Sequence, residues 1–289
     1  MHILIVNDDG PPAVPASHYV RNLVLALQAQ KHTVSVVLHH RQRSYIGKAH
    51  LVDQDITITS YYPDHALSLV GLYHHFQDRG PVDLVVSGPN YGRNTTAVFR
   101  LGSGTIGGAL EAAACGKKAV AISFGFDDYS LGANNAIIDA ASKRCVELIA
   151  RLVRDWGPNV HLFNINVPLT TKVHSAKAMY TKITQNGWTS RSCLQEIEAC
   201  SNEQAGEPIF DSSQEGSTTP SFAGDTSSVA QGQAKKKILR FVAVPEGVSA
   251  PGEMPEGQDS WTADEGMISV TPLRANFMHV DKLRGEVEL

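Results

Sequence analysis

The sequence predicts an α/β protein with a doubly wound, mostly parallel sheet and a smaller β-rich C-terminal extension. Three observations support this prediction. Short apolar runs of strand length alternate with segments of helical periodicity up to about residue 170. Several of these runs are apolar throughout, which is typical of strands buried on both faces. The 289 residues are 42% hydrophobic, which is enough to build a sizeable core.

The first elements form a strand–loop–helix–strand unit. Residues 2–6 are a run rich in β-branched apolar side chains, so we expect a buried strand there. A proline-rich loop follows, and the apolar residues from His18 to Lys31 recur at helical spacing. Thr33–Leu38 is expected to be a second buried strand. Such a unit is the building block of a parallel sheet.

The alternation of strands and helices continues along the chain. Apolar runs bounded by turn residues predict the strands, and small-residue or amphipathic stretches predict the helices. We expect strands at 83–87, 119–124 and 160–167, and helices at 69–78, 104–115 and 134–155.

The pattern changes after residue 170. Residues 201–234 are rich in Ser, Gly, Gln and Thr and contain almost no large apolar side chain, which predicts a disordered insertion. Strand-like runs follow it at 238–244 and 267–273. We therefore expect a single domain over 1–289, with a core of 1–170 and a β-rich extension of 171–289 that contains the insertion.

Composition and charge exclude several classes of protein. With 25 basic and 29 acidic residues, the formal charge is −4, which removes the global electrostatic argument for nucleic-acid binding. No apolar run reaches the roughly 18–20 residues that cross a bilayer, and the N-terminus lacks the features of a secretory signal. The 4 cysteines form no CxxC pair. We expect a cytoplasmic protein with neither a membrane nor a nucleic acid as partner.

Polar side chains follow three of the predicted strands. Asp8 and Asp9 come after the first strand, His39 and His40 after the second, and Asn90 after the third. Parallel sheets bind ligands at the carboxyl ends of their strands. Two adjacent carboxylates with neutral oxygen ligands suit Mg²⁺ or Mn²⁺. The alternative is that the two acids only form a turn before Gly10.

A second group of polar residues precedes the small-residue helix predicted at 104–115. Ser103, Gly104 and Thr105 stand at its start, where free N–H groups and the helix dipole favour a phosphate; a loop that simply enters a tightly packed helix is the alternative. The order of residues matches neither a P-loop nor a GxGxxG motif. Arg100, just before them, is expected either to pair with a phosphate or to be solvated.

Five motifs occur in an order that resembles the SurE survival-protein family, and most closely its fungal SurE-like branch. They are ILIVNDDG, RQRSYIGKAH, DLVVSGPNYGRNTT, SGTIGGALEAAACGKKAVAISF and ISVTPL. The resemblance covers about residues 1–170 and 235–275. It implies a Rossmann-like fold that forms a homodimer or tetramer.

The resemblance also implies an activity and its residues. The expected activity is that of a metal-dependent nucleotidase or acid phosphatase acting on nucleoside monophosphates, in which a divalent cation activates a water molecule. Asp8 or Asp9 would act as general base, and a phosphoaspartyl intermediate stays open. The family's metal ligands correspond to Asp8, Asp9, Ser44 and Asn90, and its phosphate-binding residues to Asn94, Ser103, Gly104 and Thr105.

One departure from the family keeps a second function open. Members of the family usually carry a Gly-Thr-Pro segment before the helix that precedes the third strand, and this chain passes directly into that helix near residue 70. The alternative is therefore a catalytically weak or inactive module on the same fold that binds a nucleotide or a partner.

Overall fold

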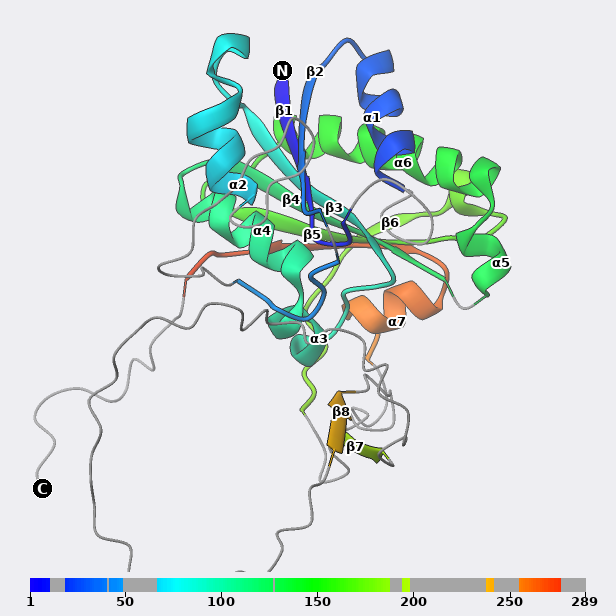
Figure 1. Ribbon diagram of the computed structural model, residues 1–289. Helices are drawn as coiled ribbons and strands as arrows, with labels where there is room; N and C mark the ends of the chain where they lie inside the picture. The colour runs from blue at the N-terminus through cyan, green and yellow to red at the C-terminus, as the bar shows by residue number, and fades with distance from the viewer. Residues whose placement is uncertain are drawn as a thin grey trace, which may run out of the picture. The chain divides into compact units, whose positions relative to one another are not determined.

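The computed structural model describes most of the predicted core and part of the C-terminal region (Figure 1). The described residues are 1–10, 19–40, 42–48, 67–126, 128–187, 194–197, 238–241 and 255–276. The chain divides into two compact units, one of residues 1–187 and 250–289 and one of residues 188–249.

A seven-stranded sheet in the order β2-β1-β3-β4-β5-β9-β6 forms the centre of the first unit. Its first five strands are parallel, β9 runs antiparallel to β5, and β6 is parallel to β9. The strands are β1 (His2–Asn7), β2 (Thr33–Leu38), β3 (Leu84–Tyr91), β4 (Lys118–Gly125), β5 (Leu162–Pro168), β6 (Ala178–Tyr180) and β9 (Ile268–Leu273). The predicted α/β class with a mostly parallel sheet is confirmed.

The strand order reverses at β1. The chain passes from β1 to β2 on one side and returns to place β3 on the other. Parallel α/β sheets bind ligands at such a reversal, beyond the carboxyl ends of the two strands that flank it. The topology therefore predicts a ligand site at the residues that follow β1 and β3.

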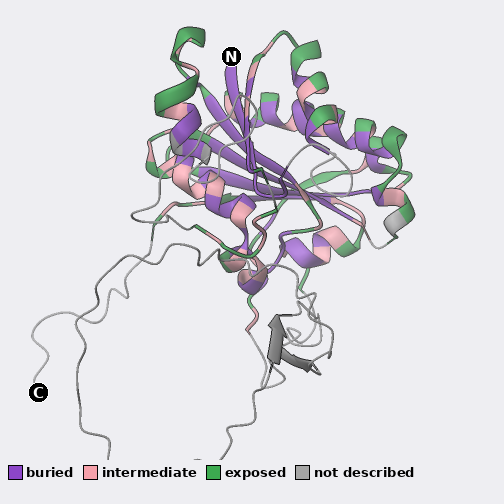
Figure 2. Cartoon of the chain, in the orientation of Figure 1, coloured by how far each residue is buried: buried purple, intermediate pink, exposed green. Residues whose placement is uncertain are grey.

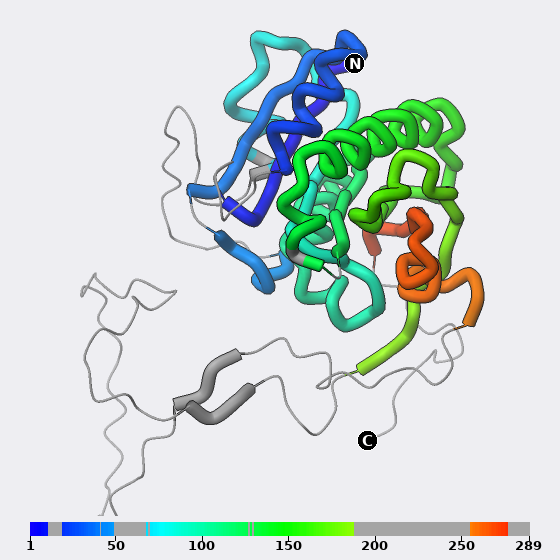
Figure 3. Tube along the Cα trace, turned by 90° about the vertical axis from the view of Figure 1, so that its right-hand side faces the viewer, coloured from blue at the N-terminus to red at the C-terminus, as the bar shows by residue number. Residues whose placement is uncertain are grey.

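Helices cover both faces of the sheet (Figures 1 and 2). On one face α1 (Tyr19–Ala29) and α6 (Asn135–Arg154) lie side by side, as the second view also shows (Figure 3). On the other face lie α2 (Leu67–Val70) and α4 (Gly104–Ala114).

Strand β1 explains why its sequence is apolar throughout. Ile3 and Ile5 belong to the buried cluster that includes α1 and α6, whereas Leu4 and Val6 belong to the cluster that includes α4. Successive strand residues point to opposite faces, so a strand covered on both sides needs apolar residues at every position. Full burial of each such side chain contributes about 1.5–3 kcal/mol.

Several short elements were not predicted. They are α3 (Ala97–Gly102), α5 (Tyr129–Gly132), α7 (Asp259–Asp264) and a 3₁₀ turn at Val173–Ser175. Elements of three to six residues are too short to display a helical period. The helix expected at 69–78 is divided into α2, a π-helical turn (Gly71–His75) and a 3₁₀ turn (Gln77–Arg79).

The extension differs in one respect from the expectation. The strand predicted at 267–273 exists as β9, and it joins the main sheet together with β6. In the second unit, β7 (Leu194–Ile197) and β8 (Ile238–Phe241) form an antiparallel pair. The insertion expected at 201–234 lies outside the described residues, so the proposed domain boundaries stay a prediction.

Among the helices of the described ranges, none combines the length and the apolar character needed to cross a membrane.

Candidate functional site

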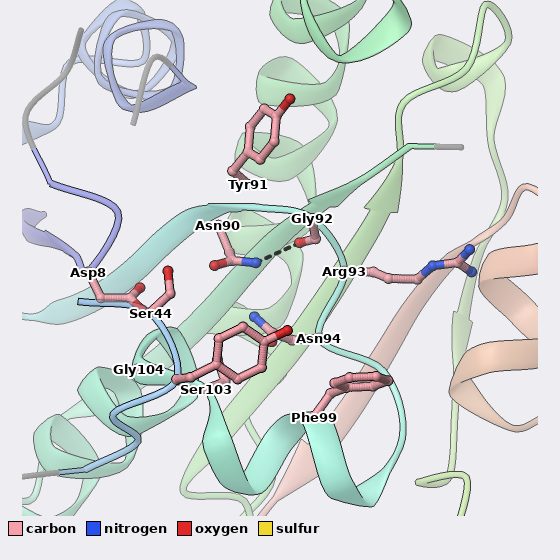
Figure 4. Close-up of a pocket in the computed structure, with 11 residues that line it drawn as sticks. Asp8, Ser44, Asn90, Tyr91, Gly92, Arg93, Asn94, Phe99, Ser103 and Gly104 are labelled. Atoms are coloured by element: carbon pink, nitrogen blue, oxygen red, sulfur yellow. Dashed lines mark hydrogen bonds between the residues drawn. The ribbon is translucent and has the colours of Figure 1, made fainter. Parts of the chain in front are cut away.

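A pocket of about 160 Å³ opens at the carboxyl ends of β1 and β3, where the strand order reverses (Figure 4). Four segments contribute to it: the turn after β1, the segment after β2, the end of β3 with the loop that follows, and the stretch from α3 to the start of α4. The residues that line it are Asp8, Ser44, Tyr45, Asn90, Tyr91, Gly92, Arg93, Asn94, Phe99, Ser103 and Gly104.

Asp8 is a buried carboxylate at the edge of this pocket. The hydroxyl of Thr105 donates a hydrogen bond to its Oδ1 atom over 2.7 Å. Burial raises the pKa of Asp8, and the bond from Thr105 opposes that rise only in part. Gly104 permits this approach, since a Cβ atom on Gly104 would lie 2.5 Å from Oδ2 of Asp8. The first turn of α4 therefore contacts the carboxylate directly.

Asp9 lies behind Asp8 and does not line the pocket. Its Oδ2 atom accepts a hydrogen bond from the backbone N–H of Tyr91 at 2.8 Å, and the hydroxyl of Ser44 lies 3.5 Å from Oδ1. Burial, and then the charge of Asp8, raise the pKa of Asp9 to about 7, against the opposing bonds from Tyr91 and Ser44. Two neighbouring carboxylates that are both buried repel each other when ionised. A cation beside them would therefore stabilise their charged forms.

Asn7 ties the turn after β1 to β3. Its Oδ1 atom accepts from the N–H of Asp9 at 2.7 Å, and its Nδ2 atom donates to the carbonyl of Pro89 at 2.9 Å. Asn7 is fully buried, so these bonds are shielded from water. They set the direction in which the two acids leave the sheet.

Asn90 turns its carboxamide oxygen toward Asp8 (Figure 4). Its Nδ2 atom donates to the carbonyl of Gly92 at 2.7 Å, which leaves Oδ1 on the other side (Figure 4). The hydroxyl of Thr105 lies 3.2 Å from that Oδ1 atom and 2.7 Å from Asp8. Because a hydroxyl has one proton, the shorter contact to Asp8 takes it and Asn90 keeps acceptor capacity.

The donor set fits a hard divalent cation. It comprises the carboxylates of Asp8 and Asp9, the hydroxyl of Ser44 and the carboxamide oxygen of Asn90, all of which are oxygen donors of the type that Mg²⁺ and Mn²⁺ prefer. Within the part of the chain that the structure describes, no group of three or more His, Cys, Asp or Glu residues could hold a metal. A cation at this pocket would therefore depend on the neutral oxygens as well as on the two acids.

Asn94 is held rigidly by residues of β4 and β5. Its Nδ2 atom donates to the hydroxyl of Ser123 at 2.9 Å, and its backbone N–H donates to Oδ1 of Asn166 at 2.7 Å. Its carbonyl accepts from Nδ2 of Asn164 at 2.9 Å. These three supporting residues were not predicted, although polar side chains inside apolar strands were a usable signal, since buried polar groups need partners.

The first turn of α4 faces the pocket. Ser103 is the N-cap residue, and its hydroxyl oxygen accepts from the N–H of Ile106 at 3.2 Å. The first N–H groups of a helix have no acceptor within that helix and carry partial positive charge. Ser103 and Gly104 line the pocket, while Thr105 is fully buried behind them. This arrangement can bind an anion.

Both expectations for Arg100 are wrong. Its side chain is 6% exposed, so it is not solvated, and Nη2 lies 2.6 Å from Oδ2 of Asp259. Nη2 also donates to the hydroxyl of Thr271 at 2.9 Å. The reason is that α3 packs against α7 and β9, which the local sequence around Arg100 does not reveal. Arg93 lines the pocket, but its guanidinium turns away and pairs with Asp264 of α7 (Figure 4).

Of the eight predicted site residues, six line the pocket and two, Asp9 and Thr105, stand directly behind it. The structure thus brings all of them to one place. Tyr45 and Phe99, which also line the pocket, were not among the predicted residues.

Comparison with known proteins places this chain in one family. The family described as Survival protein SurE matches residues 3–190, and the chain belongs to the SurE family. The crystal structure of the SurE protein from Aquifex aeolicus has the same fold, with a TM-score of 0.63 at 21% identity, over 96% of this chain and 95% of that one.

Curated relatives carry two different names. The chain is 32% identical over 183 residues to a protein of Roseobacter denitrificans named 5'-nucleotidase SurE, covering 58% of this chain and 67% of that protein. The 5'-nucleotidase SurE of Cereibacter sphaeroides is 28% identical over 294 residues, which are 98% of this chain and 97% of that one. A Saccharomyces cerevisiae protein named probable tubulin–tyrosine ligase PBY1 is 28% identical over 345 residues. That match includes 100% of this chain but only 43% of the yeast protein, so the chain spans less than half of its length.

Proposed function

We propose that the protein is a metal-dependent phosphomonoesterase that hydrolyses nucleoside monophosphates in the pocket between β1 and β3. The observation that carries this proposal is the meeting of the buried carboxylate of Asp8, with Asp9 next to it in the chain, and the N-terminus of α4 at one opening. One group suits a cation, and the other suits the phosphate that the cation would bind. The names of the bacterial relatives support the same activity.

Asp8, Asp9, Ser44 and Asn90 would hold the divalent cation, either Mg²⁺ or Mn²⁺. When bound, such a cation supplies charge neutralisation for the transferred phosphoryl group and activates water at neutral pH. The carboxamide of Asn90 is already turned for this task, since its nitrogen donates to the carbonyl of Gly92.

The phosphate would be bound by Asn94 and the first turn of α4. Because the hydroxyl oxygen of Ser103 accepts from Ile106, its proton is left to donate to a phosphate oxygen. The side chain of Thr105 donates to Asp8, so the contribution of Thr105 to phosphate binding would come from its backbone N–H. Together these donors would stabilise the charge that develops on the equatorial oxygens.

Asp8 is better placed than Asp9 to accept the proton of the attacking water. It lines the pocket, and its Oδ1 atom is engaged with Thr105, which leaves Oδ2 for the proton. Asp9 lies behind it and is engaged with Tyr91 and Ser44. We therefore assign Asp8 the role of general base and Asp9 that of a supporting cation ligand.

The experiment that tests this function is phosphate release from a panel of nucleoside monophosphates with Mg²⁺, with Mn²⁺ and with a chelator. Asp8→Asn should lose turnover by about 10²-fold or more while staying folded. Asp139→Asn is the matched control, since Asp139 lies in α6 and bonds to Asn22 on the exposed surface. Full activity in a folded Asp8→Asn protein would exclude the assignment.

The alternative function predicts a different result in the same experiment. A nucleotide- or partner-binding module would bind a nucleoside monophosphate without releasing phosphate under any metal. Two further features stay proposals: assembly into a homodimer or tetramer, which sedimentation would measure, and a cytoplasmic location.

A further inference from the structure

We propose that Tyr45 and Phe99 form an aromatic clamp that binds the nucleobase of the substrate and so makes the pocket selective for nucleotides over other phosphate esters. This inference rests on the proposed phosphomonoesterase function. Both rings line the pocket, and they come from different segments, Tyr45 from the stretch after β2 and Phe99 from α3.

The two halves of the pocket have different chemistry. Toward the sheet, the lining consists of carboxylate, carboxamide and hydroxyl groups from Asp8, Asn90 and Ser103. Tyr45 and Phe99 add two aromatic rings to the lining, and Tyr45 is 49% exposed. A phosphate needs only the polar part. An occupant that uses both parts combines a phosphate with a planar ring, as a nucleoside monophosphate does.

The backbone at Tyr45 has a conformation that tyrosine seldom adopts. Tyr45 has a φ of 65°, in the left-handed region that residues other than glycine rarely adopt. A glycine would fit the same turn without strain. Residues held in such conformations cluster at ligand-binding sites, where the surrounding structure compensates for them. The strained residue here is one that lines the pocket.

The clamp residues sit on anchored segments. A Cβ atom on Gly102 would lie 3.6 Å from Cδ1 of Tyr45, so the tyrosine ring lies against the end of α3. The N–H of Gly47 donates to the carbonyl of Gly102 at 3.1 Å and ties the two segments together. Phe99 is followed directly by Arg100, whose buried ion pair fixes α3. Rings that are held before the ligand arrives bind it at a lower entropic cost.

The test compares adenosine 5'-monophosphate with ribose 5-phosphate, which carries a hydroxyl group at C1 in place of the base. Stacking of a base on an aromatic side chain corresponds to about tenfold in affinity. We expect the wild-type kcat/KM to be about tenfold higher for the nucleotide. Phe99→Ala should remove most of this preference by lowering the value for the nucleotide, with little change for ribose 5-phosphate.

Two further variants complete the design. Tyr45→Gly removes the second ring and suits the local φ, so it should lower the preference for the nucleotide without backbone strain. Leu101→Ala is the matched control, because Leu101 lies in the same helix, is 79% exposed and does not line the pocket. It should leave both substrates unchanged.

The outcomes separate the clamp from the function on which it rests. Equal wild-type kcat/KM for the two substrates, or equal losses for both in Phe99→Ala, would overturn the clamp and leave the phosphomonoesterase intact. Turnover of neither substrate would remove the proposed function. In that case, calorimetry measures the affinity of the protein for each of the two compounds. A preference for the nucleotide that Phe99→Ala abolishes supports the clamp, and equal affinities overturn it.

Discussion

The guanidinium of Arg100 and the carboxylate of Asp259 form an ion pair of 2.6 Å in which the side chains are 6% and 0% exposed. Asp259 has further partners: its Oδ2 atom accepts from the N–H of Thr96, and its Oδ1 atom accepts from the N–H of Thr184. One carboxylate therefore connects α3, the loop before it and the segment after β6. Through α3 it positions one wall of the pocket.

Asp259→Asn should lower the free energy of unfolding by about 3–5 kcal/mol, because it leaves a buried guanidinium without its counter-charge. Urea denaturation measures this loss. Asp264→Asn is the matched control: it removes the pair with Arg93, in which the two side chains are 40% and 38% exposed. Exposed pairs contribute about 0–1 kcal/mol. Similar losses in the two variants would contradict the stabilising role of the buried pair.

Metal-free protein should become less stable, relative to an Asp9→Asn variant, as the pH rises from about 4 to about 7. The folded pKa of Asp9 is about 7 and its ordinary value is 3.8, so in this window the unfolded chain loses its proton first. The folded state then holds more protons, and stability falls as the pH rises. Thermal unfolding at pH 5 and pH 8 in the presence of a chelator measures the difference. A constant difference between wild type and variant would contradict the prediction.

A divalent cation should reverse this destabilisation. Mg²⁺ or Mn²⁺ that binds only the folded protein stabilises it by about 2.7 kcal/mol at a concentration of 100 times Kd. The rise in Tm should be larger at pH 8 than at pH 5, because a cation binds ionised carboxylates. Asp8→Asn should lose the effect, and Asp139→Asn should keep it. An equal rise in Tm in both variants would place the cation elsewhere.

Gly104→Ala should impair the site more than the fold. Its Cβ atom would lie 2.5 Å from Oδ2 of Asp8, so either α4 or the carboxylate must move. A displacement of this kind at a reacting group lowers kcat by about 10²-fold. Gly157→Ala is the matched control, since its Cβ atom would meet only Val160 at an ordinary 3.6 Å. Unchanged kcat in Gly104→Ala would show that the contact between α4 and Asp8 is dispensable.

Local patterns in the sequence were sufficient for most of the fold. A strand covered on both faces must be apolar at each position, and residues 2–6 satisfy this condition in β1. Helix α6 shows its apolar face at a period of 3.6 residues over 20 residues and starts at the cap Asn134. Asp8 and Asn90 were predictable for a related reason: where a buried strand ends, polar residues mark the edge at which parallel sheets bind ligands.

Only the tertiary structure decided how the candidate site residues are arranged and what supports them. Three features depend on contacts between segments that are far apart in the sequence. Asp9 bonds to the backbone of Tyr91, Arg100 pairs with Asp259, and Tyr45 and Phe99 line one pocket. Secondary structure follows from periodicity within about a dozen residues. The partner of a buried charge depends instead on the packing of whole elements, which no short stretch of this chain encodes by itself.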